Sequence, residues 1–301
     1  MATCVQEHTA HETSVPVSEP RISVRELLLN EKLNAVIVVL LLLVLYARSF
    51  AKLCADWLSD PNYSHGFLVR LVFIWLVWQK KNRLLKMPVE PTPAGLLLVA
   101  IAALQLLLGT LAAEFFIAHT SLLLMCAGVV LYLLGKQALR ELMFPIVWLL
   151  FMIPLPTILL RPVIFQLQLL ASVVASGTLD LFSVTNLRTG NVIYLPNFTI
   201  GIVEACSGIR SLISLIALSV LFGTIYQLRA VHRLTAVLLS IPIALAFNAA
   251  RIIGTGLIGN FGKPELAEGF FHMFSGGAIF VSATLAMFLL LRLITEPAGK
   301  V

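Results

Sequence analysis

Long runs of apolar residues occupy most of this chain and restrict its possible folds more than any other feature. A helix needs about 20 mainly apolar residues to cross the hydrocarbon core of a bilayer. Runs that approach this length cover 33–50, 66–79, 94–112, 117–135, 142–160, 209–226, 234–254 and 273–294. Because 59% of the residues are hydrophobic and only 12% are charged, a water-soluble fold cannot bury the apolar surface. The sequence therefore predicts an all-α, multi-span transmembrane helical bundle of about eight spans.

Residues 163–183 follow a different pattern from the predicted spans. Polar side chains recur there every four residues and form one stripe on a helix, made by Gln168, Ser172, Ser176 and Asp180. Such a stripe favours a helix that lies along the membrane interface. Directly afterwards, Gly190-Asn191 and Pro196-Asn197 separate β-prone residues within 186–199, which predicts a short external hairpin.

The distribution of Lys and Arg predicts the orientation, because basic loops stay in the cytoplasm. Basic residues gather in three connections, with Lys80, Lys81, Arg83 and Lys86 in the first, Lys136 and Arg140 in the second, and Arg229 and Arg233 in the third. Placing all three inside makes 51–65, 113–116, 161–205 and 255–272 external, provided that 163–183 does not cross. Residues 1–30 then form a cytoplasmic tail that we expect to be disordered, and 31–296 form the transmembrane domain.

Net charge and cysteine usage exclude several function classes. The formal charge of +6 is spread over short clusters between apolar runs, a pattern typical of topology signals and not of a nucleic-acid-binding face. The four cysteines form no CxxC pair and no metal-ligand spacing. We therefore expect no nucleic-acid partner, no disulfide framework, no metal site and no cofactor, with the lipid bilayer as the main surroundings.

Cys206 stands in a stretch with the features of an activated nucleophile, Glu204-Ala205-Cys206-Ser207-Gly208-Ile209-Arg210. A thiol at a helix N-terminus experiences the positive end of the helix dipole, and Cys206 or Ser207 could cap that helix. Arg210 follows four residues later on the same face. Both effects favour the thiolate over the thiol. The alternative interpretation is that Cys206 is a small apolar residue packed between helices.

Arg251 and His272 are predicted to reach the same external level as Cys206. Arg251 lies 17 residues beyond the inner start of its run, and His272 lies 20 residues before Arg292 at the inner end of the last run. At about 1.5 Å per residue, both stand roughly 26–30 Å up. Asn248 supplies a second polar group one turn before Arg251. Taken singly, Arg251 could snorkel and His272 could belong to an interfacial aromatic belt.

Other polar residues are expected at the same external level. Ser64 and His65 open the second run and could contact a substrate or support the site, or Ser64 could simply cap the helix. Glu204 could orient His272 or Arg251. Glu114 and His119 bracket the next external turn and are most simply interfacial polar residues.

Together these motifs resemble the exosortase/archaeosortase family of multi-span membrane cysteine transpeptidases, and in particular its bacterial exosortases. The resemblance rests on Glu204-Ala-Cys-Ser-Gly-Ile-Arg210, on Asn248-Ala-Ala-Arg251-Ile, on His272 within Phe-Phe-His-Met-Phe-Ser-Gly, and on Ser64-His65-Gly66. It covers about 33–294.

The resemblance implies that Cys206 is the nucleophile, His272 the proton-transfer residue and Arg251 the electrostatic partner. Glu204, Ser207, Arg210, Asn248, Ser64 and His65 would support the site or bind substrate. The implied substrates are secreted proteins with a C-terminal tripartite signal: a Pro-Glu-Pro-like (PEP) motif, a membrane helix and a basic end. After thioester formation the acceptor would be water, an amine or a hydroxyl. The implied location is the inner membrane of exopolysaccharide-producing bacteria, with the site facing the periplasm.

Two other function classes fit some of the same residues. A non-catalytic transporter or polysaccharide-export component could use Arg251 and His272 to bind an anion, although the inner halves of the last three runs are nearly all apolar. A membrane acyltransferase could also use a histidine at the interface.

Overall fold

The computed structural model describes residues 23–60, 63–202, 208–261 and 270–295. They form a mostly helical protein with one small sheet. The N-terminal helices are α1 (Val24–Asn30), α2 (Lys32–Leu45), α3 (Ala47–Ser59), α4 (Gly66–Leu84), α5 (Ala94–Leu111), α6 (Phe115–Leu133), α7 (Lys136–Trp148) and the 3₁₀ turn η1 (Leu149–Met152). The C-terminal helices are α8 (Thr157–Leu181), α9 (Ile209–Ile225), α10 (Ala230–Phe261) and α12 (Phe270–Thr295).

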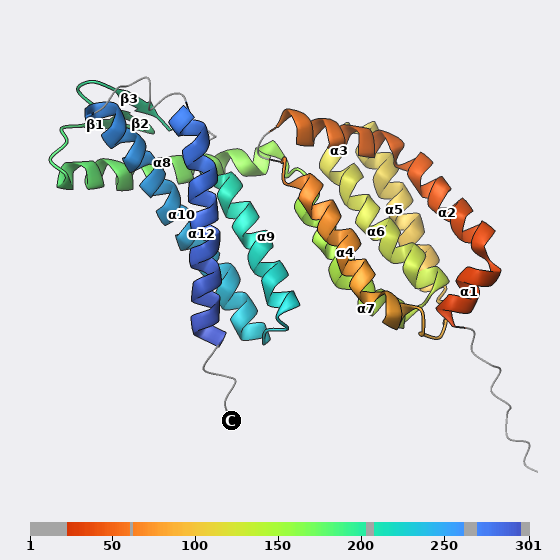
Figure 1. Cartoon of the computed structure of the whole chain (residues 1–301). Helices are drawn as coiled ribbons and strands as arrows, with labels where there is room; N and C mark the ends of the chain where they lie inside the picture. The colour runs from red at the N-terminus through yellow and green to blue at the C-terminus, as the bar shows by residue number, and fades with distance from the viewer. Residues whose placement is uncertain (1–22, 61–62, 203–207, 262–269, 296–301) are drawn as a thin grey trace, which may run out of the picture.

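The helices form two bundles joined by α8 (Figure 1). In the N-terminal bundle, α5 packs along α6, while α4 packs against α7 and η1. Its core contains Tyr46, Trp57, Met125 and Trp148, and it also takes in Ala217 of α9. In the C-terminal bundle, α10 packs against α8, α9 and α12. Helix α9 therefore contributes to the cores of both bundles.

The predicted hairpin is confirmed and carries one further strand. Strands β1 (Leu187–Thr189), β2 (Val192–Tyr194) and β3 (Thr199–Gly201) form an antiparallel sheet in that order. Gly190 has a φ of 63° in the two-residue turn between β1 and β2, a backbone conformation that glycine adopts without steric cost.

The polar stripe of α8 binds this hairpin. The Ser172 hydroxyl donates to the Gly190 carbonyl at 2.9 Å, and the Ser176 hydroxyl donates to the Asn186 side chain at 2.6 Å. The Asn186 amide in turn donates to the Asp180 carboxylate at 2.7 Å. On the opposite side of α8, apolar side chains such as Leu170 and Val174 are exposed. The helix therefore presents its polar face to the sheet and its apolar face outwards.

The number of helices able to cross a bilayer is smaller than the predicted eight. Among the described residues, five helices are long and apolar enough, namely α5, α6, α8, α10 and 276–293 of α12. The bent pair α2 and α3 could add a sixth. Helix α9 is shorter than a full span at 17 residues, α7 has 13, and α4 ends in a basic turn. Hydropathy alone merges short helices with the apolar turns that follow them, which explains the higher predicted count.

The membrane placement of α8 stays a prediction. Its 25 residues satisfy the length and composition of a span, whereas 163–183 is predicted to lie at the interface. Figure 1 shows α8 running crosswise to α9, α10 and α12, at one end of both bundles. The α4–α5, α6–α7 and α9–α10 connections, which carry the basic clusters, lie at the opposite end. This arrangement agrees with the predicted grouping of basic loops on one side.

The boundary of the predicted tail changes at its C-terminal end. Residues 24–30 form α1, whose N-cap Ser23 accepts from the Glu26 backbone while the Glu26 carboxylate accepts from the Ser23 backbone. This capping box supplies partners for two amides that the first turn cannot satisfy itself. The remainder of the predicted tail, 1–22, lies outside the described residues.

Candidate functional site

A polar cavity of about 330 Å³ lies where the two bundles meet. Its wall comes from the start of α4 in one bundle and from α9, α10 and α12 in the other. The polar lining consists of Ser64, His65, Arg210, Ser211, Ser214 and Arg251. Four residues that the sequence analysis proposed from three separate motifs therefore line one cavity.

The start of α9 depends on Gly208. This residue has a φ of 78°, in the left-handed region, and its carbonyl accepts from the Leu212 amide at 2.9 Å. A Cβ at position 208 would lie only 3.0–3.1 Å from side-chain atoms of Asn248 on α10. Glycine thus suits this position twice, because it adopts the left-handed conformation without strain and leaves room for Asn248. Asn248, which is 5% exposed, packs behind the cavity and does not line it.

Arg251 extends from α10 towards α12. Its Nη1 atom lies 3.5 Å from the position that a Cβ would take on Gly276. The absence of a side chain at Gly276, and at the neighbouring Gly277, keeps this side of the cavity open for the guanidinium. A half-buried guanidinium at such a position supplies positive potential where a charge developing on a substrate would be weakly screened.

The position of His65 is fixed by the N-terminal bundle. Its Nε2 donates to the Phe151 carbonyl of η1 at 3.0 Å, and the Trp57 indole donates to the next carbonyl, Met152, at 3.0 Å. Trp57 can approach so closely because a Cβ on Gly66 would fall 2.3 Å from its Nε1. The Ser64-His65-Gly66 motif therefore combines two residues that line the cavity with a glycine that leaves room for the Trp57 ring.

The chain that leads towards residue 206 is also held in place, at Ile202, by hydrogen bonds to Asn191. The Ile202 amide donates to the Asn191 carbonyl at 2.9 Å, and the Asn191 side chain donates to the Ile202 carbonyl at 3.0 Å. Ile202 is fully buried against the sheet. Glu204, Cys206 and Ser207 lie outside the described residues, between this anchor and Gly208.

His272 falls in the first turn of α12, one helical turn before Gly276. Its side chain lies outside what the structure describes, so the predicted contact between His272 and Arg251 stays a prediction.

Several cavity residues were missed by reading the sequence. Ser211 and Ser214 share a face of α9 with Arg210, and Phe280 lies one turn beyond Gly276 on α12. The spacing of Arg210, Ser211 and Ser214 is the signal that could have identified the first two, since residues three or four apart share a helical face. Trp57 carried no such signal, because its role depends on the distant carbonyl of Met152.

Comparison with known families gives one match over most of the chain. The model of the family described as transmembrane exosortase (Exosortase_EpsH) matches residues 57–289, well over half of the chain. That match begins at Trp57 and spans every element that contributes to the cavity. No curated protein and no solved structure matches the chain. The protein is a multi-pass membrane protein that belongs to the transmembrane exosortase family.

Proposed function

We propose that this protein is a membrane-embedded cysteine transpeptidase that cleaves and sorts secreted proteins carrying a C-terminal tripartite signal. Family membership supports the substrate class, a PEP-like motif followed by a membrane helix and a basic end. The observation that carries the catalytic proposal is the cavity itself. Two guanidinium-bearing residues, Arg210 and Arg251, line it together, and Gly208 on its wall follows the Cys206 position by two residues.

Cys206 is the proposed nucleophile. It precedes α9, whose N-terminal amides carry the positive end of the helix dipole, and Arg210 in the first turn adds a full positive charge nearby. Both effects stabilise the thiolate relative to the thiol. The thiolate attacks the scissile carbonyl carbon and forms a tetrahedral intermediate whose oxygen carries the negative charge.

Arg251 is the proposed electrostatic partner of that oxyanion, where one well-placed donor is worth about 3 kcal/mol in the transition state. When the carbon–nitrogen bond breaks, His272 gives a proton to the leaving amine and a Cys206 thioester remains. His272 then takes a proton from the acceptor, which is water, an amine or a hydroxyl. The acceptor attacks the thioester, and Cys206 leaves as the thiolate.

The remaining residues have proposed supporting roles. Ser64, His65, Ser211 and Ser214 offer polar contacts to the recognition motif inside a cavity large enough for a few residues of extended chain. Glu204 and Ser207 flank the nucleophile in sequence. We propose that the site faces the periplasm of a bacterium, because the basic connections lie at the other end of the bundles.

The direct test is co-expression with a secreted protein bearing the tripartite signal, while its cleavage is followed by the change in size. Cys206→Ala and Cys206→Ser should both reduce processing to the level of cells without the enzyme, because a serine hydroxyl is a far poorer nucleophile at neutral pH.

Cys54→Ala and Cys126→Ala are matched controls, because both residues are free thiols at the edge of the N-terminal core and away from the cavity. They should process normally. Full processing by Cys206→Ala, at equal protein level and equal thermal stability, would exclude thiol catalysis.

A further inference from the structure

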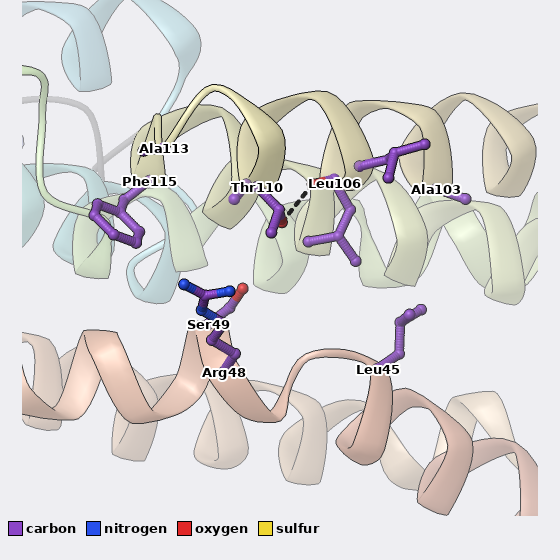
Figure 2. A pocket seen from close by; sticks show the side chains of 10 residues that line it. Leu45, Arg48, Ser49, Ala103, Leu106, Thr110, Ala113 and Phe115 are labelled. Atoms are coloured by element: carbon purple, nitrogen blue, oxygen red, sulfur yellow. Dashed lines mark hydrogen bonds between the residues drawn. The ribbon is translucent and has the colours of Figure 1, made fainter.

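A second cavity, of about 340 Å³, lies on the far side of the N-terminal bundle from the proposed catalytic site. It occupies the angle where α2 and α3 bend by 60° and face the ends of α5 and α6 (Figure 2). The bend is held at Tyr46, which is fully buried and whose hydroxyl lies 2.9 Å from the Ser121 hydroxyl of α6. The cavity is thus part of the fold and does not depend on a surface loop.

Arg48 places a positive charge in this cavity. Figure 2 shows its guanidinium reaching from the start of α3 towards α5, with Ser49 beside it. Within the described part of the chain, no carboxylate forms an ion pair with Arg48. The neighbouring cation, Lys52, has Asp56 at 2.6 Å and stands 5.3 Å from the centre of the Phe115 ring. The uncompensated charge at the cavity is therefore that of Arg48.

A buried histidine lies behind the wall of this cavity. His119 is 1% exposed, which corrects the expectation that it is an interfacial residue. Its ring stacks on Phe115, which lines the cavity, at 6.2 Å between centres, and it lies near the Ser49 backbone. The Phe115 side of the cavity is therefore backed by a buried imidazole.

The rest of the lining is apolar and open to the surroundings. Leu45 and Leu107 line the cavity and are each about half exposed, and Ala103, one turn before Leu107 on α5, presents only a methyl group there. In a multi-pass membrane protein these exposed leucines face lipid chains. An occupant that satisfies both ends needs an anionic head and a hydrocarbon tail.

We propose that this cavity binds an anionic phospholipid of the same leaflet. Its phosphodiester pairs with Arg48 and accepts from Ser49, because a guanidinium presents a planar fork of donors that matches phosphate oxygens. One acyl chain lies along Leu45, Ala103 and Leu107. The bound lipid fills the angle between α2 and α3 and ties it to the α5–α6 end. This site depends on no part of the proposed catalytic function.

Purified full-length protein in detergent tests the site directly. Phosphatidylglycerol, phosphatidylcholine with the same acyl chains, and inorganic phosphate are titrated separately, with the thermal unfolding midpoint and bound lipid by native mass spectrometry as readouts. Phosphatidylglycerol should bind saturably and raise the midpoint, whereas the other two should not. Arg48→Gln should weaken that binding about tenfold or more, the loss expected for a charge-assisted hydrogen bond.

Arg161→Gln is the matched control, because Arg161 is an exposed arginine on α8 that lines neither cavity. It should bind phosphatidylglycerol as the unchanged protein does. Ala103→Phe, which obstructs the apolar end and leaves Arg48 in place, should also weaken binding, and Arg48→Lys should retain part of it. Equal stabilisation by both phospholipids, equal stabilisation by inorganic phosphate, or unchanged binding by both Arg48→Gln and Ala103→Phe would overturn the proposal.

Discussion

At the scale of single residues, the cavity combines two positive charges with glycines on three of the helices that line it. Arg251 reaches to van der Waals distance, 3.5 Å, from the place of a Cβ on Gly276, and a Cβ on Gly208 would press on Asn248 of α10 at 3.0–3.1 Å. A thiolate, an oxyanion and two guanidinium groups need a short separation to act on one another, since Coulomb energy falls with distance. The glycines therefore serve the proposed chemistry by allowing the cations to come near.

Replacing Arg251 by lysine separates a catalytic role from snorkelling. If Arg251 holds an oxyanion with its planar fork, Arg251→Lys keeps the charge but loses the geometry, and processing should fall at least tenfold. A snorkelling arginine tolerates lysine. Processing of a tripartite-signal substrate by purified variants is the measurement, with Arg161→Lys as the control on an exposed arginine outside the cavity. Normal turnover by Arg251→Lys would contradict the proposed role.

Gly208→Ala should reduce substrate processing by more than its loss of folding stability accounts for. Alanine at a left-handed position costs about 1–2 kcal/mol, and here its Cβ would also press on Asn248 at 3.0–3.1 Å. Gly190→Ala is the matched control, because Gly190 has a φ of 63° but no atom within 4 Å of an added Cβ. Both variants should unfold at lower temperature, and only Gly208→Ala should lose processing. Equal processing by the two would show that the start of α9 tolerates displacement.

At the scale of elements, the sequence predicted what depends on local pattern and missed what depends on distant partners. The turn at Gly190-Asn191 and the polar stripe of α8 were both recognised. Their contact was not, because nothing in the spacing of Ser172 and Ser176 shows that they bond to residues 186–190 and not to water. The bend between α2 and α3 was also missed, since both helices lie in or beside one apolar run and the break is held by Ser121 of α6.

Labelling of the sheet tests the orientation of these elements. In a chain whose four cysteines are replaced by alanine, Thr189→Cys on exposed β1 should react with a membrane-impermeant maleimide in intact cells. Lys86→Cys, exposed in the basic connection after α4, should react only after permeabilisation. The opposite result would reverse the orientation and move the proposed site to the cytoplasmic side.

At the scale of the whole molecule, the proposed site belongs to neither bundle alone. The C-terminal bundle supplies Arg210 and Arg251, while the N-terminal bundle supplies His65, held by η1. Helical rise predicted that Arg251 and His272 reach one level, because depth follows from counting residues within a single helix. Which bundle faces them could not be predicted, because the packing of α9 against both cores depends on side chains more than 60 residues apart, such as Trp148 and Ala217.

This junction is also where the substrate should be found, which gives the last prediction. We expect a substrate whose scissile bond enters the cavity to place the start of its membrane helix beside α12, where Phe280 lines the cavity one turn from Gly276 and is half-buried. A photoreactive amino acid at position 280, in a Cys206→Ala chain that holds substrate without cleaving it, should crosslink to the substrate on illumination. The same group at Leu97, on the lipid-exposed face of α5 in the other bundle, should not.

Mapping the crosslink by mass spectrometry should find it within a few residues of the recognition motif, because the cavity admits only a short stretch of chain. Crosslinking from position 97 and not from position 280 would mean that the substrate docks on the N-terminal bundle, away from Arg251.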